Sequence, residues 1–176
     1  MQVALFGGSF NPPHVAHRLV GEWVLATQGA DELWLVPTFQ HPFRKDETLA
    51  PYAHRVAMTE LLAKSLGNRA RVCRIEEELG GVSYTINTID ALRAKFPHHT
   101  FKLIVGSDVA AELPKWKDIE RLRERVQFIF VNRNGAPPHS RNVSPEFPAI
   151  SSSNVRAQIS KGAPPIGEVD HAILDY

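Results

Sequence analysis

Short, mostly apolar runs alternate along the chain with longer segments in which apolar residues recur every three or four positions. The short runs predict strands, because a strand without a polar face is buried on both sides of a sheet. These runs occupy residues 3–6, 32–37, 70–75, 101–106 and 126–132. The segments with helical spacing predict helices at residues 16–30, 53–67, 85–97, 117–125, 152–162 and 168–176.

Strands that alternate with helices in this way indicate an α/β fold. We expect a Rossmann-like, doubly wound and mainly parallel sheet with helices on both faces, formed by one domain over residues 1–176. Ligands of such sheets bind beyond the carboxyl ends of the strands, where the strand order reverses. Polar or turn-rich segments that predict loops follow several strands, at residues 38–51, 76–84 and 135–148.

Composition narrows the class of protein without identifying it. Of the 176 residues, 43% are hydrophobic and 22% are charged, and the net charge is +1, so no strong overall field favours nucleic acid. The single cysteine, Cys73, excludes an internal disulfide and reads as a small apolar residue rather than a nucleophile. No apolar run approaches the roughly 20 residues that span a bilayer. We therefore expect a cytoplasmic protein with no membrane partner.

The first predicted strand leads into a turn that reads GGSFNPPHVAH, from Gly7 to His17. Two glycines let a ligand approach the backbone closely, and the helix predicted to begin near His14 directs free N–H groups at the turn. Neither the P-loop pattern nor the G-x-G-x-x-G pattern is present. An anion site and a plain strand-to-helix connection both remain open at this point.

The two histidines of this turn favour the anion site. His14 and His17 are three residues apart, so they share one face of the first helical turn. An imidazole can donate a hydrogen bond to a phosphate oxygen, more strongly when it is protonated. A zinc pair is the competing interpretation, but no third ligand lies nearby in the sequence and no H-E-x-x-H motif occurs. We expect no metal site formed by the protein itself.

At this point the sequence resembles a known family. GGSFNPPHVAH is similar to the signature of the nucleotidyltransferases that carry an H-x-G-H motif, and more closely to that of the bacterial nicotinate mononucleotide adenylyltransferases. The segment ISSSNVR, residues 150–156, resembles their late I-S-S-[ST]-x-[IV]-R motif. YTINTID, LIVGSD and LPKWKDIERL resemble family segments in the same order. The resemblance spans nearly the whole chain.

The resemblance implies a nucleotidyltransferase domain over the chain and a specific reaction. AMP would pass from ATP to nicotinate mononucleotide, which gives nicotinate adenine dinucleotide and pyrophosphate in NAD biosynthesis. ATP would bring Mg²⁺ as cofactor, and the partners would be these small molecules rather than nucleic acid. Alternatives are the same chemistry on nicotinamide mononucleotide or phosphopantetheine, and a nucleotide-binding module that does not catalyse.

The resemblance also implies roles for individual residues. The catalytic group is His14, His17 and Arg156. The residues expected to bind ATP and its phosphates are Gly7, Gly8, Ser9, Phe10, Ser152, Ser153, Arg156, Gly106 and Asp108. The residues expected to bind the pyridine nucleotide are Thr85, Trp116, Lys45 and Asn11.

Several of these residues also fit a purely structural role. The serines and the arginine of ISSSNVR could be a helix cap followed by a surface arginine, and Asp108 and Thr85 could cap helices. Trp116 could pack in the core, and Lys45 could be a solvated loop charge. His54 and Arg55, which open the second predicted helix, are expected to be structural or to lie at the edge of the site.

One position departs from the family pattern. The glycine between the two histidines of the family motif is Ala16 in this chain. If the glycine leaves room for a phosphate or base, the methyl group of Ala16 intrudes on the ligand. If the position is only helical, alanine fits and favours the helix.

Overall fold

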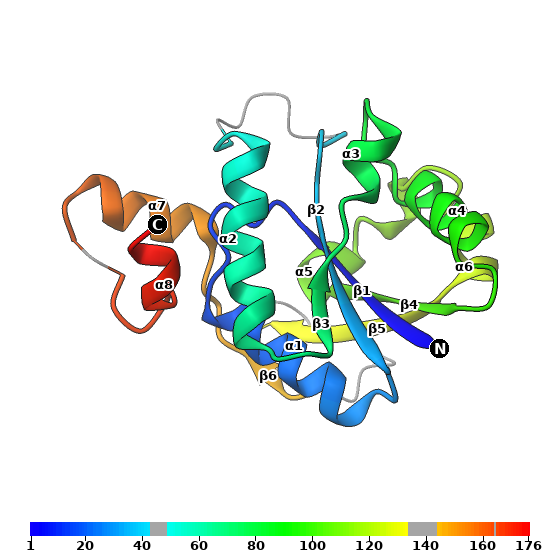
Figure 1. Cartoon of the computed structure of the whole chain (residues 1–176), viewed down its shortest axis with the longest axis horizontal. Helices are drawn as coiled ribbons and strands as arrows, with labels where there is room; N and C mark the ends of the chain where they lie inside the picture. Colours follow the sequence, from blue (N-terminus) through cyan, green and yellow to red (C-terminus); the bar gives the residue numbers. More distant parts are fainter. Residues whose placement is uncertain (43–48, 134–143, 164) are drawn as a thin grey trace.

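The structure of the chain is a computed structural model that describes residues 1–42, 49–133, 144–163 and 165–176. Its centre is a six-stranded sheet in the order β3-β2-β1-β4-β5-β6, in which every neighbouring pair is parallel (Figure 1). The strands are β1 (Gln2–Gly8), β2 (Glu32–Pro37), β3 (Ala70–Val72), β4 (Thr100–Gly106), β5 (Gln127–Arg133) and β6 (Glu146–Phe147). The predicted Rossmann-like α/β fold is confirmed, and the strand order reverses between β1 and β4.

Helices cover both faces of the sheet (Figure 1). One face packs against α1 (Val15–Thr27), α2 (Tyr52–Ser65), α7 (Ser152–Ser160) and α8 (His171–Leu174). The other packs against α3 (Ile75–Leu79), α4 (Thr85–Lys95) and α6 (Ile119–Arg125). The short helices α5 (Ser107–Ala110) and η1 (Leu113–Lys115) connect β4 to α6.

The two layers explain why the strand sequences are apolar throughout. In β2, Leu33 and Leu35 belong to the core cluster under α1 and α2, whereas Trp34 and Val36 belong to the cluster under α3 and α4. Successive side chains of a strand point to opposite faces, so a strand covered on both sides needs an apolar residue at each position. Because its side chains alternate between the two faces, each central strand lies between two separate apolar core clusters.

The structure corrects the loop predicted at residues 76–84. Residues Ile75–Leu79 form α3, with Ile75 buried in the core and three glutamates in the first turn. Carboxylates at a helix N-terminus are favourable because they face the positive end of the helix dipole. The helix ends at Gly80, whose φ of 65° is readily adopted by glycine.

Smaller differences lie at the edges of the sheet and in one connection. The strand predicted at 70–75 is shorter, since β3 ends at Val72 and Cys73 follows it. Within the loop predicted at 135–148, residues Glu146–Phe147 form β6 beside the end of β5. The sequence did not predict α5 or η1, which are only four and three residues long.

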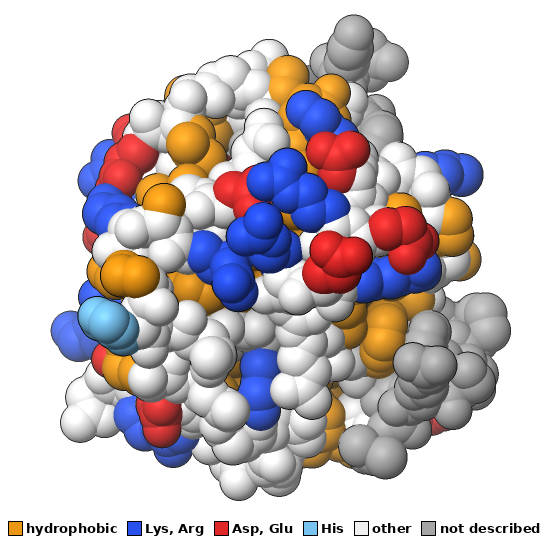
Figure 2. All heavy atoms as spheres, turned by 90° about the vertical axis from the view of Figure 1, so that its right-hand side faces the viewer, with side chains coloured by type: hydrophobic (Ala, Val, Ile, Leu, Met, Phe, Trp, Pro, Cys, Tyr) orange, Lys and Arg blue, Asp and Glu red, His pale blue; other side chains and the backbone are white. Residues whose placement is uncertain are grey.

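The face formed by α4 and α6 carries many charged side chains (Figure 2). Lysine and arginine side chains lie there beside carboxylates, and Arg121 pairs with Asp90 at 2.7 Å while Lys95 pairs with Glu78 at 2.7 Å. Positive and negative side chains are therefore interspersed on this surface, and some of them form ion pairs with one another. In the part of the chain that the structure describes, no helix is long and apolar enough to cross a membrane.

Candidate active site

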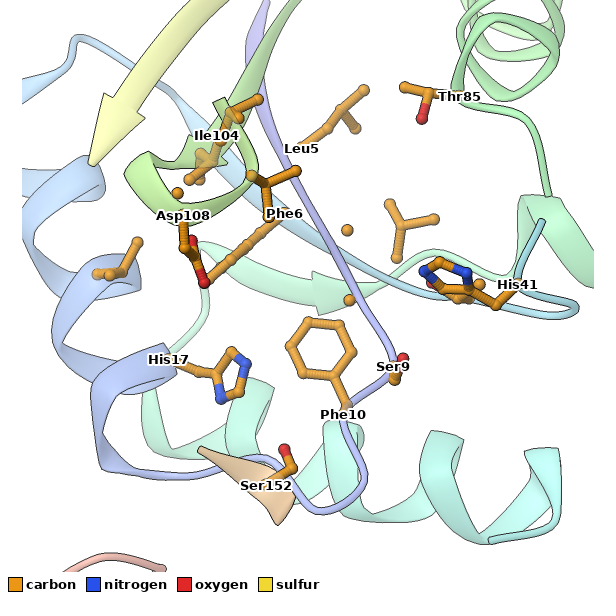
Figure 3. A pocket seen from close by; sticks show the side chains of 18 of the residues that line it. Leu5, Phe6, Ser9, Phe10, His17, His41, Thr85, Ile104, Asp108 and Ser152 are labelled. Atoms are coloured by element: carbon orange, nitrogen blue, oxygen red, sulfur yellow. The ribbon is translucent and has the colours of Figure 1, made fainter. Parts of the chain in front are cut away.

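A cavity of about 650 Å³ opens at the carboxyl ends of β1, β2, β4 and β5, where the strand order reverses. Figure 3 shows it as two halves on either side of β1. His17, Asp108 and Ser152 lie in one half, which we call the α1 side. His41 and Thr85 lie in the other, which we call the α4 side. All predicted site residues within the described ranges line this cavity, and only Lys45 lies outside those ranges.

The glycines belong to the end of β1 rather than to the turn that follows it. A Cβ on Gly7 would meet no atom within 4 Å, and a Cβ on Gly8 would lie 3.4 Å from the ring of Phe10. Phe10 has a φ of 46°, which is uncommon for a bulky residue, and its ring is buried against Phe6 and His17. The ring of Phe10 thus anchors the turn in the core, and only its backbone can contribute to an anion site.

His14 and His17 form a compact pair at the start of α1. Their ring centroids are 3.8 Å apart, and the N–H of His14 donates to Nδ1 of His17 at 3.2 Å. Because Nδ1 of His17 accepts, Nε2 is the ring nitrogen left to carry a proton in the neutral form.

The surroundings of the pair disfavour positive charge. Burial, followed by the charge of Arg133, lowers the pKa of His14 to about 4. Burial and then the neighbouring His14 and Arg133 lower the pKa of His17 well below its usual value. At neutral pH the free protein therefore presents neutral imidazoles, not the protonated ones that would bind phosphate most strongly.

The start of α7 is joined directly to the turn before α1. Ser152 Oγ donates to the carbonyl of Pro12 at 2.8 Å, and Arg156 Nη1 donates to the carbonyl of Asn11 at 2.7 Å. Ser151, one of the serines of ISSSNVR, caps α7 by accepting from the N–H of Asn154. These bonds bring the early histidines and the late serine–arginine segment to one cavity.

The hydroxyl of Ser152 is already engaged by the turn, which leaves less of this segment free for a ligand than the sequence suggested. Ser153 is exposed, and its Oγ lies 3.5 Å from Arg156 Nη2. The guanidinium of Arg156 therefore connects Asn11 to Ser153. It is partly buried and lines the cavity.

Asp108 is held by an arginine that the sequence did not reveal. Arg133 Nη1 donates to Asp108 Oδ2 at 2.7 Å, and its Nη2 donates to the carbonyl of Ile150. A Cβ on Gly106 would clash with Asp108 Oδ1, so a side chain at this position would force Asp108 to shift. Asp108 does not cap α5, whose cap is Gly106. Arg133 ends a strand and carries no motif, so only its three-dimensional contacts identify it.

On the α4 side, Thr85 is the first residue of α4 and Tyr84 is its cap residue, so Thr85 is not the helix cap. Trp116 lines the cavity and also packs against the core cluster under α4. Lys117 Nζ lies 4.7 Å from the centroid of the Tyr84 ring at this rim. Sequence reasoning missed Tyr84 and Lys117 at this position.

Asn11 is 2% exposed, and its side-chain oxygen accepts from the N–H of Ala50 at 3.1 Å. Within the described residues, its Nδ2 has no hydrogen-bond partner. The bond from the N–H of Ala50 ties residues 9–14, which join β1 to α1 and which we call the phosphate turn after their predicted role, to the start of α2. The residues predicted to bind the pyridine nucleotide therefore come from both the turn and the α4 side.

Comparisons with known proteins agree with this architecture. The family model for cytidylyltransferase-like proteins matches residues 5–158. A probable nicotinate-nucleotide adenylyltransferase of Anaeromyxobacter sp. (strain K) is 46% identical over 178 residues, covering 99% of this chain and 92% of the relative. The protein of the same description from Myxococcus xanthus (strain DK1622) is 40% identical over 176 residues, covering 100% of this chain and 91% of the relative.

Solved structures share the fold at lower identity. The nicotinic acid mononucleotide adenylyltransferase of Plasmodium falciparum, complexed with NaAD, superposes with a TM-score of 0.82 at 20% identity. The superposition covers 99% of this chain and 93% of the other. A putative nicotinate-nucleotide adenylyltransferase of Vibrio parahaemolyticus gives a TM-score of 0.75 at 16% identity, covering 99% and 90%.

Proposed function

Because the chain belongs to the cytidylyltransferase-like family, we propose that it is a nicotinate-nucleotide adenylyltransferase of NAD biosynthesis. It transfers AMP from ATP to nicotinate mononucleotide and releases pyrophosphate. The observation that carries the proposal is the joining of α7 to the turn before α1, through Ser152 and Arg156, beside the histidine pair. Relatives that match over the full chain support the choice of acceptor.

The reaction is an in-line displacement at phosphorus. An oxygen of the mononucleotide phosphate forms a bond to the α-phosphorus of ATP, and the bond from that phosphorus to the bridging oxygen of pyrophosphate breaks. Such a transfer depends on bringing two anions together and stabilising the charge that develops. It requires no covalent intermediate on the protein.

We assign the binding of the ATP phosphates to residues on the α1 side of the cavity. They are His14, His17 and Arg156, together with Ser152 and Ser153. In the free protein His17 is neutral and carries its proton on Nε2, from which it can donate to a phosphate oxygen. The approach of a polyphosphate raises the pKa of both imidazoles. The charge of the histidines therefore grows as the phosphates bind. The backbone from Gly7 to Phe10 and the Gly106–Asp108 segment bind the rest of the nucleotide.

We assign the binding of the pyridine nucleotide to the α4 side of the cavity. The indole of Trp116 lies where it can stack on an electron-poor ring, and the Thr85 hydroxyl lies at the start of α4, where free N–H groups favour a carboxylate. Asn11 and Lys45 complete this set, Lys45 as a prediction from the sequence alone.

Mg²⁺ fits this site as a companion of ATP rather than as a resident ion. Asp108, a carboxylate of the α1 side, is paired with Arg133, and no cluster of three or more His, Cys, Asp or Glu side chains occurs in the described ranges. The protein need not supply a full set of ligands, because the ion would arrive with ATP and would supply positive charge that offsets part of the charge of the phosphates. The action of residues 1–176 as one nucleotidyltransferase domain and a cytoplasmic location remain predictions from the sequence.

The test is pyrophosphate release with ATP and each acceptor in parallel assays. We expect turnover with nicotinate mononucleotide to exceed turnover with nicotinamide mononucleotide and with phosphopantetheine. Equal or faster release with either of the other acceptors contradicts the assigned substrate. ATP binding by calorimetry without pyrophosphate release from any acceptor contradicts the assignment as an enzyme.

A further inference from the structure

The peptide group between Thr38 and Phe39 lies between two side chains of opposite charge. Arg55 Nη1 donates to the carbonyl of Thr38 at 2.7 Å. The N–H of Phe39 donates to Glu76 Oε2 at 3.0 Å and is shared with Ser83 Oγ at 3.2 Å. The carbonyl and the N–H of a trans peptide point in opposite directions, so its dipole is aligned between the cation and the carboxylate.

Arg55 connects this peptide to the phosphate turn. It is 2% exposed, and its Nη1 also donates to the carbonyl of Ser9 at 3.0 Å while its Nε donates to the carbonyl of Ala50 at 3.1 Å. The ring of Tyr52 lies 5.2 Å from the guanidinium carbon. One buried fork of donors thus joins three segments of backbone, and Ser9 and Thr38 both line the cavity.

Glu76 connects the same peptide to the start of α4. Its Oε1 accepts from the hydroxyl of Thr88 at 3.2 Å. Ser83 reinforces this connection, because its Oγ accepts from the N–H of Gln40 at 3.1 Å and its N–H donates to the carbonyl of Gln40 at 2.8 Å. Residues 38–40 are therefore bound to the segment that leads into Thr85.

We propose that Arg55 and Glu76 are positioning residues that hold the Thr38–Phe39 peptide. They thereby keep the segment 38–42, which we call the acceptor wall of the cavity, at a fixed distance from the phosphate turn. This inference rests on the proposed function, which assigns the acceptor nucleotide to the α4 side. The charges matter because a charged partner makes a stronger hydrogen bond to the peptide than a neutral one. Neither residue is placed in contact with the reacting atoms.

The first test is Glu76→Gln. The amide has nearly the same shape: its oxygen can accept from the N–H of Phe39 while its NH2 donates to the hydroxyl of Thr88, so this variant removes the negative charge and can keep both hydrogen bonds. We expect the KM for nicotinate mononucleotide to rise about tenfold, the effect of replacing a charged hydrogen bond by a neutral one, while the KM for ATP stays unchanged. Glu78→Gln is the matched control, because Glu78 lies on the same helix but is exposed and pairs with Lys95.

The second test is Arg55→Lys, which keeps the positive charge and removes the forked N–H donors of the guanidinium. Lysine cannot span the three carbonyls, so both the phosphate turn and the acceptor wall shift. We expect kcat/KM to fall by about 10²-fold, as for a misplacement of about 1 Å. Arg69→Lys is the matched control: Arg69 also donates to main-chain carbonyls, of Ala30 and Asp31, just before the start of β2. This control is expected to lower the melting temperature and to leave kcat and both KM values unchanged.

The double variant measures whether the two side chains act on one structure. Because both hold the same peptide, we expect the loss in the double variant to be smaller than the product of the single losses. The wild-type assay with nicotinate mononucleotide tests the proposed function separately. The proposal is overturned if Glu76→Gln leaves the acceptor KM unchanged or raises both KM values alike. It is also overturned if Arg55→Lys only lowers the melting temperature, as Arg69→Lys does. If Arg55→Lys does not fold, the acceptor KM of Glu76→Gln decides alone.

Discussion

At the scale of single residues, the site is defined by which polar atoms are already used within the protein. Nδ1 of His17 accepts a hydrogen bond from the backbone, Ser152 donates to the turn, and Arg133 is paired with Asp108. His17 is left with Nε2 as its donor, and its position is fixed by the backbone bond and by packing against Phe10. A donor fixed in this way costs little reorganisation when charge develops on a phosphate.

His17→Ala tests this assignment. Removing one preorganised donor to developing charge lowers turnover by about 10²–10³-fold in comparable sites. We expect a loss of that size in kcat, measured by pyrophosphate release at saturating substrates. His171→Ala is the control, since His171 is exposed at the start of α8, and it should leave kcat unchanged. Full turnover by His17→Ala contradicts the catalytic role.

The residues that sequence reasoning found and those it missed differ in what they contact. His14, His17 and Arg156 stand in motifs, so their presence in one cavity could be predicted. The sequence placed Arg55 only at the start of a helix and gave no role to Glu76. In the structure Arg55 donates to carbonyls 5, 17 and 46 residues away along the chain, and Glu76 accepts from an N–H 37 residues away. Backbone carbonyls and N–H groups carry no sequence signal, so only the folded chain reveals such partners.

At the scale of elements, prediction succeeded where an apolar run filled a strand or a helical pattern covered several turns, and it failed where a helix had only one turn. The strand predicted at 32–37 coincides with β2, and the helix predicted at 85–97 contains α4. By contrast, α3 is five residues long, so its apolar pattern consists of little more than Ile75 and Leu79. One helical turn cannot establish a period of 3.6 residues, and its stability comes from packing after the fold has formed.

Helix α1 offers a test of the departure at Ala16. The residue is 7% exposed, lies in the first turn of α1 and lines the cavity. Glycine in a helix is less stable than alanine by roughly 0.5–1 kcal/mol, so Ala16→Gly should lower the free energy of unfolding by up to about that amount. If alanine fits the bound nucleotide, turnover should not rise. Ala26→Gly, on an exposed part of the same helix, is the matched control for stability. Activity that appears only in Ala16→Gly favours a chain that binds nucleotide without catalysis.

At the scale of the whole molecule, the site depends on the topology of the sheet. The strand order reverses between β1 and β4, so the connections after these strands diverge to opposite faces and leave a crevice between them. Segments from both ends of the chain are tied together across this crevice, as the bonds from Ser152 to Pro12 and from Arg156 to Asn11 show. Stability and active-site geometry are therefore linked through the same contacts.

The histidine pair makes this link dependent on pH. Burial holds the pKa of His14 at about 4 in the folded protein, against 6.5 as its ordinary value. Between these two values the unfolded chain binds a proton that the folded chain does not bind. The contribution of His14 to stability is therefore complete above about pH 6.5 and is lost as the pH falls towards about 4.

The measurement is urea unfolding of wild type and His14→Asn at about pH 7.5 and about pH 5. Between these two pH values His14 should change the free energy of unfolding of the wild type by about 2 kcal/mol. Asparagine is a favourable helix cap, so this variant removes the titrating ring while it keeps the start of α1. We expect the wild type to lose more stability between the two pH values than His14→Asn does. His171→Asn, at an exposed position, should keep the wild-type pH dependence. The same pH dependence in His14→Asn and wild type would mean that His14 is as easily protonated in the folded chain as in the unfolded one. The neutral imidazole assigned to the free site would then be wrong.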